Sequence, residues 1–216
     1  MKSIKLLLLS ALPLAGLAQG GELKLKGTLK NILNAQWVFV SFRSGEDKIT
    51  DSIRVEKASF KYKRPLAEAV LATINVRSAA TQDGSAPKEY ARSVFIEPGS
   101  IDVTIDTTSQ RALVTGSRAN EDFEALNKAQ QPYDEQLKPL YNAYNQAARE
   151  KNTAARDAAE HAIDSIDNVK TEAVYGSFLK TNGQSPIALY ALRQYAGYSI
   201  DPDKIGPLFD ALPAAQ

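Results

Sequence analysis

The stretch VFIEPGSIDVTID, residues 94–106, decides the fold class of this chain of 216 residues. Its apolar start, Val94 to Ile96, ends at a Glu-Pro-Gly sequence that is typical of a type II turn. From Ile101 to Asp106, apolar and polar residues alternate, which indicates a strand with one buried face and one face in water. A strand, a tight turn and a second strand therefore follow one another here.

The same kind of pattern recurs through residues 22–118, which hold eight Val residues. Such β-branched residues favour strands. The segment 37–42 is apolar on both faces apart from Ser41 and is expected to be a central strand, and the segment 70–76 is expected to be another buried strand. Further strands are predicted at 23–30, 53–55, 60–63 and 113–114, and residues 79–90 are predicted to form a long exposed loop. Seven or eight short strands joined by turns predict an antiparallel β-sandwich or a curled sheet.

The composition changes near Gly116-Ser117. Residues 119–216 contain eighteen Ala and two Val, and alanine favours helices. The first predicted helix is capped by Ser117 or Asn120, and Pro132 and Pro139 should kink or split it. The other three predicted helices run from about Thr153 to Thr181, from Ser185-Pro186 onward, and from Asp201-Pro202 to near Leu212. The sequence thus predicts an α+β chain, with a β-sandwich-like module at 22–118 and a helical linker or bundle segment of three or four helices at 119–216.

Residues 1–18 have the layout of a secretory signal peptide. Two lysines precede an apolar run from Leu6 to Leu17, and small residues lead to Ala18. Such a run is too short to span the roughly 30 Å apolar core of a bilayer. We expect cleavage after Ala18 and export to the periplasm or cell envelope, with no transmembrane span in the mature protein.

The residue counts exclude several kinds of chemistry. The chain has no Cys, one His and a formal net charge of +1. It therefore has no thiol nucleophile, no disulfide and no Cys-ligated zinc or iron–sulfur site. It also has no strong global field to attract nucleic acid.

Two constellations with catalytic or metal-binding residue types have simpler explanations. His161 shares a helix face with Asp157 and Asp164, but no Gly-x-Ser-x-Gly sequence supplies a nucleophile. A solvated helix face with local charge pairing is therefore the better interpretation. Residues 201–206 resemble the start of a calcium loop, but Leu212 stands where the loop needs an acidic ligand, which favours helix initiation.

Other candidate residues are carboxylates and aromatics. Glu97, Asp102 and Asp106 could be the carboxylates of a glycoside hydrolase, but alternation places the two aspartates on the wet face of a strand. The basic stretch 57–64, with two aromatic residues, could be a nucleic-acid platform or a strand with one charged face. Tyrosines could line a sugar-binding groove, although their helical spacing favours half-buried core positions; they are Tyr133, Tyr141, Tyr144, Tyr190, Tyr195 and Tyr198. We therefore assign no catalytic, cofactor-binding or metal-ligating residue and expect no cofactor.

Several short sequence motifs resemble those of a family of exported proteins. They are KGTL at 26–29, DSI at 51–53, ASFKY at 58–62, FIEPGSI at 95–101, VTID at 103–106 and VTGS at 114–117, followed by Asn120. Together with the order of signal, strands and helices, they resemble the N-terminal domain of unknown function and the helical linker of Bacteroidota thiol–disulfide oxidoreductases. In that family a thioredoxin-like domain of the TlpA/ResA or AhpC/TSA kind follows, so the resemblance implies a part in envelope disulfide chemistry and cell redox homeostasis.

This chain departs from the family pattern at the redox motif. The family's Trp-Cys-x-x-Cys sequence is absent, and the single Trp, Trp37, lies in a predicted strand. No catalytic residue can therefore be carried over. A smaller departure is Ala58, which stands where the family usually has Gly.

Three hypotheses about function follow. In the first, the chain is a non-catalytic module that positions a thioredoxin-like domain, dimerises or recognises an envelope client protein. In the second, it is a stand-alone envelope module that binds protein or glycan through exposed aromatics such as Trp37, Tyr195 or Tyr198. In the third, it is a hydrolase, which requires a nucleophile beside His161.

Overall fold

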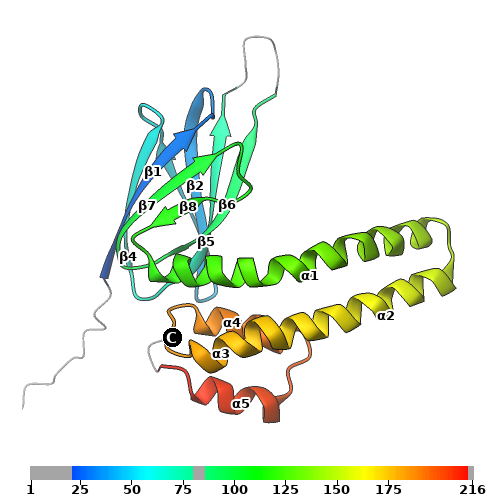
Figure 1. Cartoon of the computed structure of the whole chain (residues 1–216). Helices are drawn as coiled ribbons and strands as arrows, with labels where there is room; N and C mark the ends of the chain where they lie inside the picture. The colour runs from blue at the N-terminus through cyan, green and yellow to red at the C-terminus, as the bar shows by residue number, and fades with distance from the viewer. Residues whose placement is uncertain (1–20, 80–85, 214–216) are drawn as a thin grey trace, which may run out of the picture.

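A computed structural model describes residues 21–79 and 86–213 (Figure 1). The strands are β1 (Gly21–Lys30), β2 (Ala35–Ser44), β3 (Asp47–Arg54), β4 (Ser59–Leu66), β5 (Val70–Ser78), β6 (Glu89–Ile96), β7 (Gly99–Asp106) and β8 (Leu113–Thr115). The helical elements are α1 (Arg118–Arg149), α2 (Thr153–Lys170), the π-helical η1 (Thr171–Gly176), α3 (Ser177–Thr181), α4 (Ala188–Ala196) and α5 (Pro202–Asp210). The predicted α+β class, with strands before helices, is confirmed. The predicted signal peptide and residues 80–85 of the predicted loop lie outside the described residues.

The strands form two four-stranded sheets with the orders β4-β1-β7-β8 and β3-β2-β5-β6. Their inward faces pack together around one core, in which side chains such as Leu23, Val40, Ile74 and Ile105 are fully buried or nearly so. These side chains lie at alternate positions of their strands, as the hydrophobic pattern predicts.

One strand pair differs from the antiparallel expectation. Strands β1 and β7 run parallel, with Leu23 opposite Gly99 and Lys30 opposite Asp106. The reason is that the turn after Ile96 does not make a hairpin within one sheet. It carries the chain from β6 in one sheet to β7 in the other, so that β7 enters beside β1 in the same direction. The other strand pairs in the two sheets are antiparallel.

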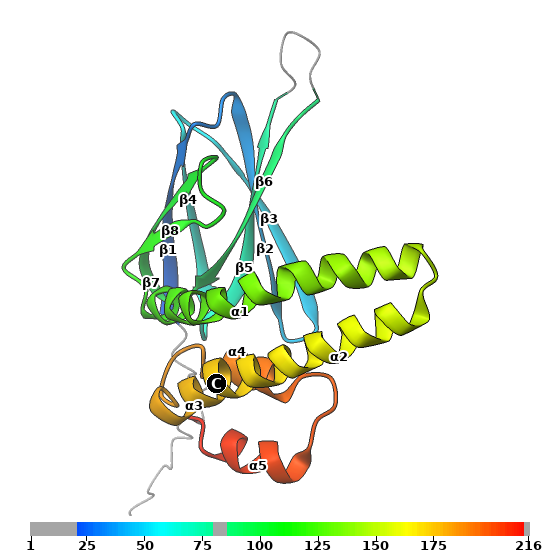
Figure 2. The same cartoon turned by 45° about the vertical axis from the view of Figure 1, so that its right-hand side comes forward.

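Strands β2 and β5 are central, as predicted, but the expectation that both their faces are buried is wrong. Val38 is fully buried, whereas Trp37 retains 40% of its exposure on the opposite face and Leu71 retains 38%. The helices pack below the end of the sandwich rather than over this outer face (Figure 2), and for that reason it remains in contact with solvent.

A polar cluster joins the edge strands β3 and β4 on one side of the sandwich. The Tyr62 hydroxyl donates to Asp51 at 2.5 Å, and Arg64 pairs with the same carboxylate at 2.7 Å. Burial, and then the hydrogen bond to Asp51, raise the pKa of Tyr62 to about 12. These contacts link the two sheets along this side.

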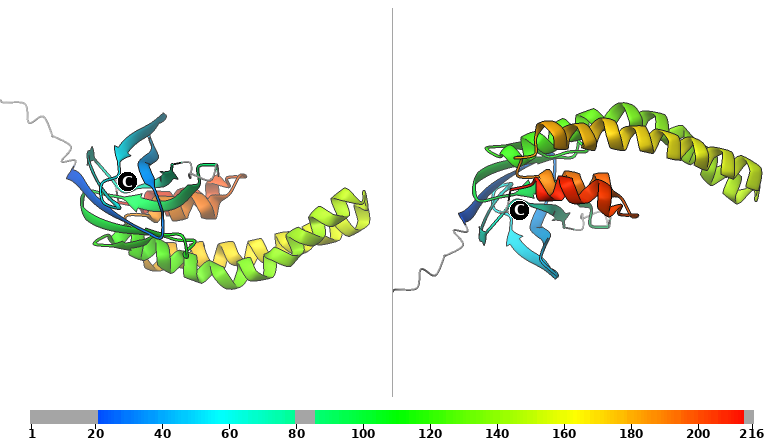
Figure 3. Two further views of the ribbon diagram at one scale, coloured as in Figure 1. Left: turned by 90° about the horizontal axis from the view of Figure 1, so that it is seen from above. Right: turned by 90° about the horizontal axis from the view of Figure 1, so that it is seen from below.

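Helix α1 runs as one element over 32 residues, about 48 Å at the usual helical rise. Pro132 and Pro139 both lie inside it, so the prediction that they split the helix is wrong. Both prolines are exposed, and α1 bends smoothly rather than breaking (Figure 3). Helix α2 returns antiparallel along α1, and the two form an arm that extends away from the sandwich (Figures 1 and 3). The predicted helix from Thr153 to Thr181 corresponds to the consecutive elements α2, η1 and α3.

Candidate functional site

The junction between the sandwich and the helices is built around Asn120 in the first turn of α1. Its side-chain oxygen accepts from the Phe95 backbone N–H at 2.9 Å, and its amide nitrogen donates to the Phe95 carbonyl at 2.7 Å. The amide therefore satisfies both backbone groups of a β6 residue, as a neighbouring strand would. With 7% exposure, Asn120 is shielded from water. A single side chain thus fixes the start of α1 to the edge of a sheet.

Ser117 and Glu97 complete this end of the helix. Ser117 caps α1, because its hydroxyl accepts from the Asn120 N–H at 3.1 Å. The same hydroxyl donates to Glu97 at 2.5 Å. Gly116 precedes the cap at φ +78, and a Cβ there would lie 2.7 Å from the Ser100 carbonyl oxygen. Glycine is therefore required at this point for both conformation and close approach.

A second link ties α1 to the segment before α4. Asp122 is 9% exposed and accepts from the Ser185 hydroxyl at 2.6 Å. Arg118 donates to both oxygens of the same carboxylate at 3.0 Å. The Ser185 hydroxyl in turn accepts from the Ile187 N–H at 3.2 Å. The distant segments around 122 and 185 are thereby held together.

Three aromatic rings pack in the same junction. Phe95 from β6, Phe123 from α1 and Tyr190 from α4 meet edge to face, with centroids 5.2 to 5.7 Å apart. Such edge-to-face contacts stabilise the fold by more than the burial of their apolar area alone would do. They join a second apolar core that includes Leu126, Val174 and Leu192. We call the polar links and these rings together the junction; its residues are Phe95, Glu97, Ser117, Arg118, Asn120, Asp122, Phe123, Ser185 and Tyr190.

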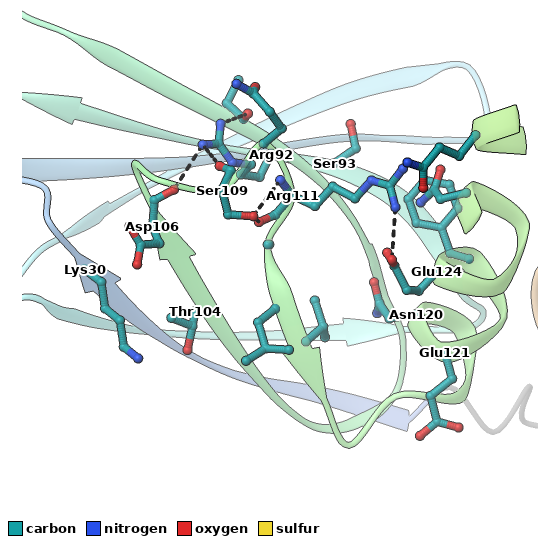
Figure 4. Close-up of a pocket in the computed structure, with 18 residues that line it drawn as sticks. Lys30, Arg92, Ser93, Thr104, Asp106, Ser109, Arg111, Asn120, Glu121 and Glu124 are labelled. Atoms are coloured by element: carbon teal, nitrogen blue, oxygen red, sulfur yellow. Dashed lines mark hydrogen bonds and ion pairs between the residues drawn. The ribbon is translucent and has the colours of Figure 1, made fainter. Parts of the chain in front are cut away.

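A trough of about 1260 Å³ lies between β6, the segment 109–114 and the first turns of α1 (Figure 4). Most of its charged groups are satisfied internally. Arg111 pairs with Glu124 at 2.9 Å, and Arg92 donates to the carbonyl oxygens of Asp106 and Ser109. The Thr108 backbone N–H, followed by the Asn31 and Thr108 side chains, lowers the pKa of Asp106. These contacts close the side of the sandwich and leave no obvious acid–base pair among the described lining residues.

A groove of about 690 Å³ lies between the end of the β2–β5 pair and α4. Its apolar lining includes Leu71, Phe95, Ile187 and Tyr190. Charged residues at its rim are Arg43, Lys48, Glu68 and Arg193. Unlike the trough, this rim has no ion pair between described residues within 4 Å.

The candidate hydrolase residues are not brought together. His161 is exposed on α2 and forms no hydrogen bond with a described residue. Asp157 instead pairs with its neighbour Arg156 at 2.9 Å. The hydrolase hypothesis required a nucleophile in contact with His161, and the described part of the chain offers none.

The remaining carboxylate candidates have structural roles. Asp201 caps α5 by accepting from the N–H groups of Asp203 and Lys204, as helix initiation predicts. Asp102 is exposed, and Glu97 belongs to the junction. Within residues 21–79 and 86–213, no group of three or more His, Cys, Asp or Glu residues could hold a metal ion.

The aromatic candidates divide between core and surface. Phe60 and Tyr62 are 3% and 7% exposed, so the basic stretch 57–64 has no stacking platform for bases and that interpretation is wrong. Tyr195 is held by Glu172 at 3.0 Å and lies beneath the Lys204 amine. The other tyrosines are half-buried at 133, 144 and 190 and exposed at 141 and 198.

Glu172, Tyr195 and Lys204 fasten α5 to η1. The Lys204 amine donates to Glu172 at 2.7 Å, and this hydrogen bond, followed by the one with Tyr195, raises the pKa of Lys204 to about 12. The hydrogen bonds from Lys204 and then from Tyr195 lower the pKa of the Glu172 carboxyl. The cluster is exposed, and its mutual hydrogen bonds explain the shifts without a catalytic role.

Comparison with protein families gives one match. Residues 23–123 match the sequence model of a family described as a domain of unknown function (DUF4369). The matched range covers the strands from Leu23 onward and the start of α1 from Arg118 to Phe123. It therefore includes Asn120 and Asp122 but ends in the first turns of α1, so that most of the arm lies outside it. No curated protein and no solved structure matches the chain. Among the described helices, none has the length and apolar character needed to cross a bilayer.

Proposed function

We propose that this chain is a non-catalytic module of an exported thiol–disulfide oxidoreductase, which holds a thioredoxin-like partner domain or an envelope client in a fixed position. The observation that carries the proposal is the junction. Asn120 and Asp122 bind the sandwich and the helical segment into one unit through buried hydrogen bonds. A positioning module needs a rigid connection of this kind, because a flexible connection would let the bound partner adopt many orientations.

The composition and the resemblance support the same proposal. The chain contains no Cys, so the thiol chemistry would belong to the thioredoxin-like partner, whether joined to this chain or separate. The sequence phrases that resemble the oxidoreductase family include FIEPGSI and VTGS, which supply Phe95, Glu97 and Ser117 of the junction. Residues that carry the resemblance therefore also hold the junction together.

The proposal is tested in the source organism by deleting the codons for residues 22–213 in frame. Exported proteins are then alkylated with a thiol reagent that adds mass, and their oxidised and reduced fractions are compared. The proposal predicts a shift in these fractions that the wild-type chain restores. Unchanged fractions in the deletion strain would refute it.

We also propose that residues 1–18 direct export. Mass spectrometry of the mature protein, purified from the envelope fraction, is expected to find Gln19 as the first residue. Retention of Met1, or recovery of the chain from the cytoplasm alone, would contradict this.

A stand-alone envelope module that binds glycan is the alternative. The observation that favours it is Trp37, which is 40% exposed on the outer face of the β3-β2-β5-β6 sheet between Arg54 and Arg77. In gels containing envelope polysaccharide, this alternative predicts retarded migration of the wild-type chain and normal migration of Trp37→Ala. Equal migration of the two would remove it.

A further inference from the structure

The groove beside α4 combines an apolar floor with an uncompensated basic rim. Leu71, on the outer face of β5, is 38% exposed, and Tyr190 stands on the α4 side. The volume of about 690 Å³ is in the range of pockets that hold a few side chains or a small ligand. Figures 1 and 2 show α4 below the lower end of the sandwich. The groove is lined by residues of this end and of α4.

The rim carries three cations and one carboxylate. Arg43 comes from β2, Lys48 from β3 and Arg193 from α4, and Glu68 opposes them. None of the four forms an ion pair or a side-chain hydrogen bond with a described residue. The rim therefore has an excess of two positive charges, while the net charge of the whole chain is +1.

This state differs from that of five of the eight other described arginines. Arg64, Arg77, Arg111, Arg118 and Arg156 each pair with a carboxylate at 3.0 Å or less. Arginine readily forms such bidentate or charge-assisted contacts when a carboxylate is near. Cations gathered around an apolar floor without acidic partners leave a surface complementary to acidic, partly apolar material.

We infer that this groove binds an acidic polypeptide segment of a partner protein, with an apolar side chain seated between Leu71 and Tyr190. Carboxylates of the segment meet Arg43, Lys48 and Arg193, which surround the opening from three different elements. An inorganic anion would satisfy the rim but would leave the apolar floor in water. A segment with both features covers the two parts of the surface at once.

The groove is preformed by the junction. Tyr190 packs against Phe95 with ring centroids 5.4 Å apart, and the chain entering α4 is held by the hydrogen bond between Ser185 and Asp122. Because these contacts already fix α4 beside the sheet, less ordering is required when the segment binds. The inference deepens the proposed function and rests on it only in treating the segment as part of a client.

The experiment uses the full chain and two fluorescent peptides. The acidic peptide has the sequence DEDLFDED, and the control peptide KRKLFKRK reverses every charge. Fluorescence anisotropy is expected to show binding of the acidic peptide alone, and binding should weaken as salt rises from about 0.05 to 0.5 M. Replacing the Leu-Phe pair of the acidic peptide by Ser-Ser should weaken binding by about tenfold, because the apolar floor is then unfilled.

A matched pair of charge-reversal variants separates this groove from general electrostatics. The double variant Arg43→Glu/Arg193→Glu should lose at least about tenfold in affinity. The control Lys138→Glu/Arg149→Glu makes the same change in net charge on exposed residues of the arm, and it should bind like the wild type. Melting temperatures of all variants are measured so that an unfolded variant is recognised, and Arg43→Gln and Arg193→Gln then replace it.

The inference is overturned if neither peptide binds at about 1 mM, if both bind equally, or if the arm control loses as much affinity as the groove variant. Failure here leaves the proposed function standing, because the peptide assay has no redox readout. Conversely, unchanged envelope thiols in the deletion strain refute the proposed function without bearing on peptide affinity.

Discussion

Replacing Asn120 by Ala should weaken the junction more than any other truncation of a polar side chain in α1. The side chain makes hydrogen bonds of 2.9 and 2.7 Å to the Phe95 backbone and of 2.7 Å to the Ser117 hydroxyl. Truncation removes these bonds and leaves two backbone groups of Phe95 without partners. A net hydrogen bond contributes about 0.5–1.5 kcal/mol, and a buried group left unpaired costs about 1–3 kcal/mol.

The trough borders Asn120, so in the Ala variant water can enter the space left by the side chain and form hydrogen bonds with part of the unpaired Phe95 backbone. We therefore expect a loss of about 3 kcal/mol in the free energy of unfolding. For a chain of 216 residues, this corresponds to a fall of about 6–12 °C in melting temperature. Hydrogen exchange followed by mass spectrometry should locate the faster exchange at Phe95 and in the first turns of α1.

Asn127→Ala is the matched control, because Asn127 lies two turns further along α1 and makes no hydrogen bond with its side chain to a described residue. It should change the free energy of unfolding by about 0.5 kcal/mol or less. A loss below about 1 kcal/mol for Asn120→Ala, or equal losses for the two variants, would refute the reasoning.

Asn120→Asp adds a test of the same bonds by pH. An ionised Asp can accept from the Phe95 N–H but cannot donate to the Phe95 carbonyl, whereas a protonated Asp can do both. The folded state should therefore raise the pKa of this carboxyl. The variant is expected to be nearest to wild-type stability at about pH 4 and to lose stability as the pH rises through the folded-state pKa. A pH-independent difference from the wild type would contradict this.

Three further predictions concern the sandwich and the helices. Tyr62→Phe should lower the free energy of unfolding by about 1 kcal/mol, because the hydrogen bond to Asp51 is lost. Since the folded state raises the pKa of Tyr62 to about 12, the stability of the wild type should also fall from about pH 10 upward. Chemical unfolding at several pH values measures both effects. Gly27→Ala places a Cβ 1.9 Å from the Phe60 ring and should cost several kcal/mol or prevent folding, whereas Gly206→Ala meets nothing within 4 Å in α5 and should stabilise by up to about 1 kcal/mol; similar melting temperatures for the two variants would contradict the packing described. Pro139→Ala should raise the melting temperature, because an exposed proline inside a continuous helix removes one backbone hydrogen bond, and an unchanged or lower value would show that the bend of α1 is stabilising.

The sequence predicts much of the local structure because local rules govern it. Strands such as β1 and β7 have one wet face, so their burial follows the alternation of their residues. Ser117 and Asp201 cap α1 and α5 as their residue types indicate. The outer face of β2 is the exception, since an apolar residue such as Trp37 does not reveal whether another layer covers it.

What the sequence could not supply is the long-range pairing. The alternation of apolar and polar residues is the same in parallel and antiparallel strands, so it does not indicate that β1 and β7 run parallel. Asn120 reads as a helix cap, but its main partners lie 25 residues earlier in β6. The one usable signal was the joint occurrence of the FIEPGSI and VTGS phrases with Asn120, which the structure brings together at the junction.

The central claim is that the sandwich and the helical arm form one rigid body. The absence of Cys makes the measurement clean, because spin labels attach only where Cys is introduced. The pair Lys61→Cys/Ala154→Cys labels exposed positions on β4 and on the arm, and the pair Ser52→Cys/Lys61→Cys serves as a control within the sandwich. Electron paramagnetic resonance should give one distance distribution from sandwich to arm that is about as narrow as the control, and it should broaden in Asn120→Ala. A broad or two-peaked distribution in the otherwise wild-type chain would contradict the claim.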